Sequence, residues 1–118
     1  MALTIYHNPR CSKSRKTLEI IRTAGVEPHI VLHLEETPSA DRIVAVAGKL
    51  DMKVSDLLRR GESEFKEAAD LPDLDDDTAL AAWLEQHPKV LERPIVVDEN
   101  SGKAVVGRPP ENVAALLP

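Results

Sequence analysis

The 118-residue chain has few aromatic residues and a single cysteine. Its three large aromatic side chains are those of Tyr6, Phe65 and Trp83, so the core must be aliphatic. Proteins that bind single-stranded nucleic acid stack the bases on aromatic side chains, so this scarcity argues against a nucleic-acid partner. A lone cysteine cannot form an intramolecular disulfide, and a reducing compartment would keep it as a thiol or thiolate.

Long apolar runs are also missing from the sequence. No stretch approaches the roughly 18 apolar residues that span a membrane, and the N-terminus lacks the basic-then-apolar pattern of a signal peptide. We therefore expect a cytoplasmic protein with no membrane partner. The length fits a single domain over residues 1–118, and the modest net charge of −5 without a second large apolar stripe favours a monomer.

Acidic residues are absent from the first eighteen positions, although the whole chain is acidic. The only cysteine, Cys11, lies in this stretch, in the segment HNPRCSKSR. Four cations surround it in sequence: Arg10, Lys13, Arg15 and Lys16. An inert, buried cysteine is the alternative interpretation, but the polar flanks of Cys11 do not form an apolar pocket. The cations, and His7 nearby, predict a lowered pKa and a reactive thiolate.

Hydrophobic patterning predicts a strand–helix–strand opening, a helical middle and a strand–strand–helix ending. Strands are expected at residues 3–7, 29–34, 95–98 and 104–106, with the second parallel to the first and central in the sheet. Helices are expected at residues 12–24, 37–50, 55–60, 63–69, 75–87 and 109–117, with Thr37 as the N-cap of the second and Gly25 ending the first. This order is typical of an α/β, thioredoxin-like fold: a four-stranded mixed sheet with an inserted helical subdomain at residues 37–87.

The acidic triplet at residues 75–77 invites comparison with a metal site. Acidic residues are, however, common in the first turn of a helix, where they face the positive end of its dipole. We therefore expect helix capping here, and no metal.

The position of Cys11 also predicts an anion site. It is expected where the first strand turns into the first helix, and the free N–H groups of a helix N-terminus bind oxyanions. The C-x5-R spacing of the tyrosine-phosphatase loop is excluded because Thr17 stands where the arginine would be. A C-x-x-C pair is excluded because Ser14 holds the second position. Any adduct or disulfide on Cys11 must therefore be resolved by an outside thiol.

Three arginines are candidates for binding an oxyanion beside this thiolate. Arg93 and Arg108 each precede a proline, which fixes the direction of the side chain. Arg93 comes just before the third strand and Arg108 just after the fourth, so both can lie near the turn that carries Cys11. Arg59 comes from the helical middle and could cover the same place.

Five segments resemble one known family in their order and spacing. They are IYHNPRCSKSRKTLEII, LEETP, DLLRRGE, HPKVLERPIVV and GRPPENV. The chain is similar to the glutaredoxin-dependent arsenate reductases, and in particular to their short-chain subgroup. The resemblance implies a thioredoxin-like fold, no bound cofactor, and a cis peptide bond between Arg93 and Pro94.

The resemblance also implies roles for individual residues. Cys11 would be the nucleophile. The oxyanion would be bound by Arg59, Arg93 and Arg108. His7 and Ser14 would help to hold the thiolate form, and Asn8 would shape the loop. The implied reaction reduces arsenate to arsenite through a Cys11 adduct, with glutathione as co-substrate and glutaredoxin as partner.

Two other functions stay open at this point. One is a glutathione-dependent thiol reductase with an unidentified substrate. The other is a redox-related regulator that binds RNA polymerase, as in a branch of the same fold that senses redox state through a C-x-x-C. Ser14 stands where the second cysteine of that C-x-x-C would be, so this chain cannot form the switch disulfide. Such a regulator would also not explain the three arginines.

Overall fold

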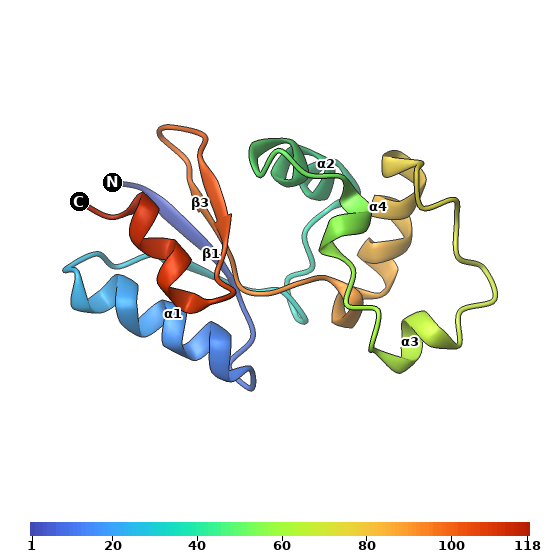
Figure 1. Cartoon of the computed structure of the whole chain (residues 1–118), viewed down its shortest axis with the longest axis horizontal. Coiled ribbons are helices and arrows are strands. Elements are labelled where there is room, and N and C mark those ends of the chain that lie inside the picture. The colour runs from blue at the N-terminus through green and yellow to red at the C-terminus, as the bar shows by residue number, and fades with distance from the viewer. The chain divides into compact units, whose positions relative to one another are not determined.

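The computed structural model describes all residues, 1–118, which form two compact units (Figure 1). The first unit combines the two ends of the chain, Met1–Glu36 and Arg93–Pro118. The second unit is the intervening segment, Thr37–Glu92. The expectation that residues 37–87 are an insertion within one domain remains a prediction.

The first unit is built on a four-stranded mixed sheet. Its strands are β1 (Leu3–His7), β2 (His29–Leu32), β3 (Ile95–Asp98) and β4 (Ala104–Val106). They are ordered β2-β1-β3-β4. Strand β1 is parallel to β2 and antiparallel to β3, which is antiparallel to β4. This arrangement confirms the predicted α/β, thioredoxin-like fold.

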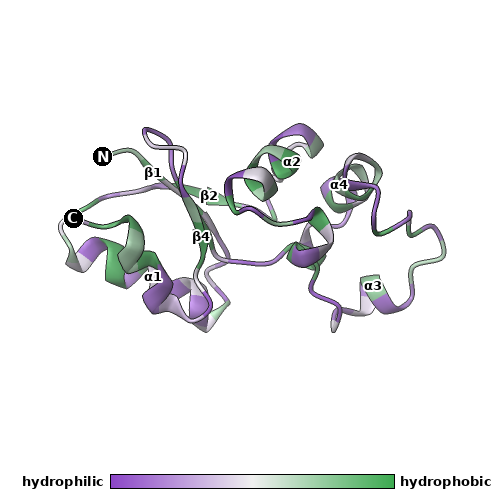
Figure 2. Cartoon of the chain, turned by 45° about the horizontal axis from the view of Figure 1, so that its top comes forward, coloured by the Kyte–Doolittle hydropathy of each residue, from purple (hydrophilic) through white to green (hydrophobic).

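Two helices, α1 (Ser12–Thr23) and the 3₁₀ helix η3 (Pro110–Leu116), pack together and share a core with one face of the sheet. Alternation along β1 turns every second side chain toward this face, and helical spacing does the same along α1. The resulting core consists of Leu3, Ile5, Leu18, Ile21, Val96, Val113 and Leu116. In Figure 2 the strands are mainly hydrophobic, whereas α1 carries both hydrophilic and hydrophobic residues.

The second unit is helical. It contains α2 (Ala40–Lys49), η1 (Val54–Leu57), α3 (Ser63–Lys66), α4 (Asp77–Gln86) and η2 (Pro88–Val90). Helices α2 and α4 pack against each other through apolar faces. Asp76 is the N-cap of α4, and its carboxylate accepts a hydrogen bond from the backbone N–H of Ala79. The acidic triplet therefore caps a helix, as its sequence predicted.

The structure corrects several boundaries. Strand β2 ends at Leu32, because the chain then turns and the N–H groups of Glu35 and Glu36 both bond to the Leu32 carbonyl. This strand lies at the edge of the sheet and not at its centre, since β1 has β3 on its other side. Helix α2 is capped by Ser39, whose hydroxyl accepts from the N–H of Arg42, and so begins after the predicted Thr37 cap.

The expected helices at residues 55–60 and 63–69 are also shorter, a 3₁₀ turn and a single α-helical turn. The last helix is 3₁₀ throughout. Gly25 does end α1, with a positive φ of 83°. No helix in the structure is both long and apolar enough to cross a membrane.

Candidate active site

Cys11 is the N-cap residue of α1. Its backbone is extended, with φ −94° and ψ 121°, and its N–H donates to the Asn8 carbonyl at 3.0 Å. It thus holds the position at which Ser, Thr, Asp or Asn usually accepts hydrogen bonds from the first helical turn. The Cys11 side chain makes no such capping bond in the structure. A thiolate would be a better acceptor, so this position favours the anion.

The loop before Cys11 is tied to the first turn of α1 by Ser14. The Ser14 hydroxyl accepts a hydrogen bond from the backbone N–H of Asn8 at 3.1 Å and is joined to Nδ1 of His7 at 2.6 Å. The side-chain oxygen of Asn8 accepts from the backbone N–H of Arg10 at 3.0 Å. His7, Asn8 and Ser14 are all buried. These contacts fix the course of the chain on the way into Cys11.

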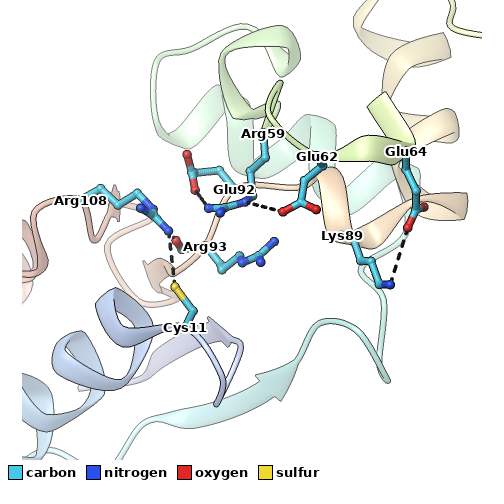
Figure 3. A network of polar contacts seen from close by, with 8 residues as sticks. All are labelled: Cys11, Arg59, Glu62, Glu64, Lys89, Glu92, Arg93 and Arg108. Atoms are coloured by element: carbon cyan, nitrogen blue, oxygen red, sulfur yellow. Dashed lines mark hydrogen bonds and ion pairs between the residues drawn. The ribbon is translucent and has the colours of Figure 1, made fainter. Parts of the chain in front are cut away.

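Arg108 is the cation that reaches the sulfur. Its Nη2 lies 3.4 Å from Cys11 Sγ, and its Nε donates to the carbonyl of Arg93 at 2.9 Å (Figure 3). Both Arg–Pro peptide bonds, Arg93–Pro94 and Arg108–Pro109, are cis. The first was expected from the family resemblance, and the second was not. Through the two contacts of Arg108, the Arg-Pro segments meet beside Cys11.

Gly107, which was not predicted from the sequence, explains how Arg108 comes so close to the sulfur of Cys11. Its N–H donates to the Pro94 carbonyl at 2.9 Å. A Cβ at this position would lie 2.5 Å from the Thr17 hydroxyl oxygen and 2.7 Å from Cγ of Pro94. Only glycine fits without displacement of these neighbours. The sequence did contain a signal for this residue, namely a glycine directly before an Arg-Pro pair.

The pKa of the Cys11 thiol lies below its ordinary value. Burial is the largest single influence, and it acts to raise this pKa. The backbone N–H of Ser14, the charge of Arg108, the N–H of Lys13 and the charge of Arg93 together outweigh burial. The lowered pKa was expected, and so was the effect of the N–H groups at the helix N-terminus. The charges that lower this pKa are those of Arg108 and Arg93, which are distant in sequence, and not those of the side chains that flank Cys11.

Burial lowers the pKa of His7, and the charges of Arg22 and Arg15 lower it further. The ring is therefore neutral at pH 7 and adds no positive charge beside the sulfur. His7 is not among the groups whose charge lowers the pKa of Cys11. A supporting role through its hydrogen bond to Ser14 stays a prediction.

Arg59 belongs to the second unit, where two carboxylates hold its guanidinium group. Its Nη1 lies 3.0 Å from Glu92 Oε1, and its Nε lies 3.4 Å from Glu62 Oε1 (Figure 3). Its backbone N–H donates to the Val90 carbonyl. The role of Arg59 beside Cys11 stays a prediction. No group of three His, Cys, Asp or Glu side chains in the structure is arranged to hold a metal ion.

Comparison with known proteins shows the family of the chain. The model of the ArsC family matches residues 6–116. The chain belongs to the ArsC family. It is 40% identical to an arsenate reductase of Escherichia coli, over 98% of this chain and 81% of that protein. It is 38% identical to an arsenate reductase of Haemophilus influenzae, over 99% of this chain and 100% of that protein.

A solved structure agrees with this membership of the ArsC family. The arsenate reductase from Vibrio cholerae superposes with a TM-score of 0.87 at 39% sequence identity, covering 99% of this chain and 98% of that one. In this ArsC-family chain, the structure brings together Cys11, Ser14, Arg93 and Arg108, with His7 and Asn8 supporting the loop. A thiolate, helix N–H groups and arginines in one place can attack and hold an oxyanion.

Proposed function

We propose that this protein is an arsenate reductase that reduces arsenate to arsenite through a covalent adduct on Cys11. The observation that carries this proposal is the contact of Arg108 Nη2 with Cys11 Sγ at 3.4 Å, at the N-terminus of α1. A cation at that distance stabilises a thiolate and can also hold a bound oxyanion. The arsenate reductases among its relatives, similar over nearly the whole chain, support the choice of oxyanion.

The first step is nucleophilic. The Cys11 thiolate forms a sulfur–arsenic bond, and one arsenic–oxygen bond breaks as that oxygen takes up protons and leaves as water. Arsenic is still pentavalent in this adduct. Reduction needs two electrons, which two outside thiols supply as they join in a disulfide. Overall, one hydrogen arsenate dianion, two thiols and two protons give one neutral arsenous acid, one disulfide and one water.

Glutathione is the proposed first outside thiol, and glutaredoxin is the partner that removes it. The support is that Cys11 is the only cysteine in the chain, so no internal thiol can resolve the adduct. We propose that the protein works as a monomer in the cytoplasm, where such thiols are kept reduced, and that it needs no bound cofactor.

Arg93 and Arg108 are proposed to bind the oxyanion, with Arg59 as a third ligand. For Arg59 the support is the family resemblance, together with its ion pair to Glu92, the residue directly before Arg93 in the chain. A hydrogen bond to a charged group contributes roughly 1.5–3 kcal/mol. Because arsenous acid is neutral, these arginines attract the substrate and release the product. Phosphate has nearly the same shape and charge, so reducibility of arsenic must provide the discrimination.

The test is an assay in which NADPH oxidation is coupled through glutathione reductase to glutathione and glutaredoxin. We expect NADPH consumption that depends on arsenate and yields arsenite, with no turnover of phosphate. Turnover of a disulfide substrate without any response to arsenate would instead indicate the glutathione-dependent thiol reductase. Absence of all turnover, with specific binding to RNA polymerase, would indicate the regulator.

A further inference from the structure

A cavity of about 390 Å³ lies beside the loop that carries Cys11, and it is lined by residues of the first unit alone. The lining comes from the end of β1, the loop after it, and the end and exit of β2. The lining residues are His7, Asn8, Pro9, Arg10, Leu32, Leu34 and Glu35. Small-ligand pockets occupy roughly 300–1,000 Å³, so this volume suits a small molecule and not a folded domain.

The cavity wall carries one charge of each sign. Arg10 and Glu35 are both exposed, and the side chain of neither takes part in an ion pair or a hydrogen bond in the structure. Leu34 is 40% exposed, one of the few large apolar side chains left open to solvent. A ligand that suits this wall therefore has a positive and a negative end and an apolar stretch between them.

The lining also includes the end of an edge strand. Leu32 is the last residue of β2, which pairs with β1 on one side only. An unpaired strand edge offers backbone N–H and C=O groups to an extended peptide. His7 adds one more polar group, because its Nδ1 is engaged by Ser14 and its Nε2 remains for a ligand. The chemistry of the wall is that of a site for a short zwitterionic peptide.

We propose that this cavity binds the outside thiol, a small zwitterionic peptide thiol of the glutathione type. Glu35 receives its ammonium group and Arg10 one of its carboxylates. This inference rests on the proposed function, and it concerns only where the thiol binds.

The cavity adjoins the nucleophile along the chain. Pro9 and Arg10 directly precede Cys11, and Asn8 accepts the hydrogen bond of the Cys11 N–H at 3.0 Å. An extended tripeptide spans roughly 10 Å. In the proposed pose its two ends lie against Arg10 and Glu35, and its central thiol lies at the rim of the cavity that is next to Cys11 along the chain.

The test measures binding of S-methylglutathione to the full-length protein by calorimetry, without arsenate. This probe keeps every charge of glutathione but cannot react. We expect Arg10→Gln and Glu35→Gln each to weaken its Kd about two- to fivefold, the upper part of the range for one exposed charged contact. The matched controls are Lys16→Gln and Glu36→Gln, exposed charges outside the cavity, and we expect less than a twofold change from them.

In turnover, the same two cavity variants should raise the KM for glutathione by the same factor and leave the KM for arsenate unchanged. The fragment γ-glutamylcysteine, which retains the only ammonium group of glutathione, should lose affinity in Glu35→Gln, whereas N-acetylcysteinylglycine, which has no ammonium group, should not.

Three results would overturn the proposal. One is binding of S-methylglutathione that the cavity variants affect no more than the controls do. Another is no binding of the probe at all. The third is weakened binding of glutaredoxin with unchanged binding of S-methylglutathione, which would make the cavity a protein-docking surface. In each case arsenate reduction can persist, whereas loss of arsenate-dependent turnover in the wild-type protein would overturn the proposed function instead.

Discussion

Two parts of the first unit bring positive charge toward Cys11. One is the segment of residues 10–16, which flanks the cysteine in sequence. The other is the pair of Arg-Pro segments at Arg93 and Arg108, which are far away in sequence and reach it in space. In the flanking segment, Arg15 donates to the Pro9 carbonyl at 3.0 Å, and Lys16 pairs with Glu19 at 3.7 Å.

The two parts therefore act on the sulfur by different means. The flanking segment acts through its backbone, because the N–H groups of Lys13 and Ser14 favour the thiolate. Side chains in the first turn of a helix project outward from its axis, so their charges are screened by water. The Arg-Pro segments supply charge, because Gly107 lets the chain pass close to α1 and leads directly into Arg108. The helix terminus at Cys11 depends on residues close to it in sequence, whereas the cation beside the sulfur is brought there by the fold.

The largest effect is expected from Cys11→Ser, which removes the group on which both parts act. A serine hydroxyl is not ionised at neutral pH and is a poor nucleophile toward arsenic, so arsenate-dependent NADPH consumption should fall to background. Circular dichroism should show an unchanged fold. Residual arsenate reduction by a folded Cys11→Ser protein would mean that another residue carries the chemistry.

A smaller but clear loss is expected from Arg108→Ala. It removes the contact at 3.4 Å to the sulfur, and kcat/KM for arsenate should fall about tenfold or more, the equivalent of one charged hydrogen bond. Arg93→Ala should destabilise the Cys11 thiolate less than Arg108→Ala does, since the charge of Arg93 acts more weakly on Cys11. Steady-state kinetics and alkylation rates measure both. A larger rise in the Cys11 pKa from Arg93→Ala than from Arg108→Ala would reverse this order.

Gly107→Ala tests whether backbone packing places Arg108. The added Cβ would collide with Thr17 and Pro94, and overpacking of this kind destabilises a protein by about 1–3 kcal/mol. We expect a lower urea midpoint and a severalfold lower kcat/KM, through displacement of Arg108. The matched control is Gly48→Ala in α2, where a Cβ meets nothing within 4 Å. That change should be neutral or stabilising, because alanine favours helices.

The smallest effect is expected from the flanking side chains. The double variant Lys13→Ala/Lys16→Ala keeps the backbone N–H groups and both Arg-Pro segments. Its kcat/KM for arsenate should change less than twofold, and any change should disappear at high salt, because exposed charges are screened. A loss as large as that of Arg108→Ala would show that the flanking charges matter after all.

Much of the fold could be predicted from local pattern. Alternation gave the bounds of β1, and the turn residues at 99–102 gave those of β3 and β4. The place of β2 in the sheet was predicted wrongly, because strand order depends on pairing between distant segments. The N-cap of α2 was misplaced by two residues because Thr37 and Ser39 are both good caps, and only tertiary packing chooses between them.

The candidate site likewise has features that local sequence predicts and features that depend on contacts between distant segments. Cys11 and the anion-favouring helix terminus follow from residues close together in sequence, and so could be predicted. The direction of Arg108 depends on the absence of a side chain at Gly107 and on the course of the chain past Thr17, which no periodicity reveals. The neutral state of His7 depends on its burial, and the ion pairs of Arg59 on two carboxylates, one of them 33 positions away in sequence.

The most direct test of the account is the rate of Cys11 alkylation by iodoacetamide as a function of pH. The folded protein, the same chain unfolded in urea, and folded Arg108→Ala should be compared. Because only the thiolate reacts, the inflection reports the pKa. The account predicts that the folded protein has the lowest inflection, the unfolded chain the highest, and Arg108→Ala one between them. An inflection in the folded protein at or above that of the unfolded chain would contradict it.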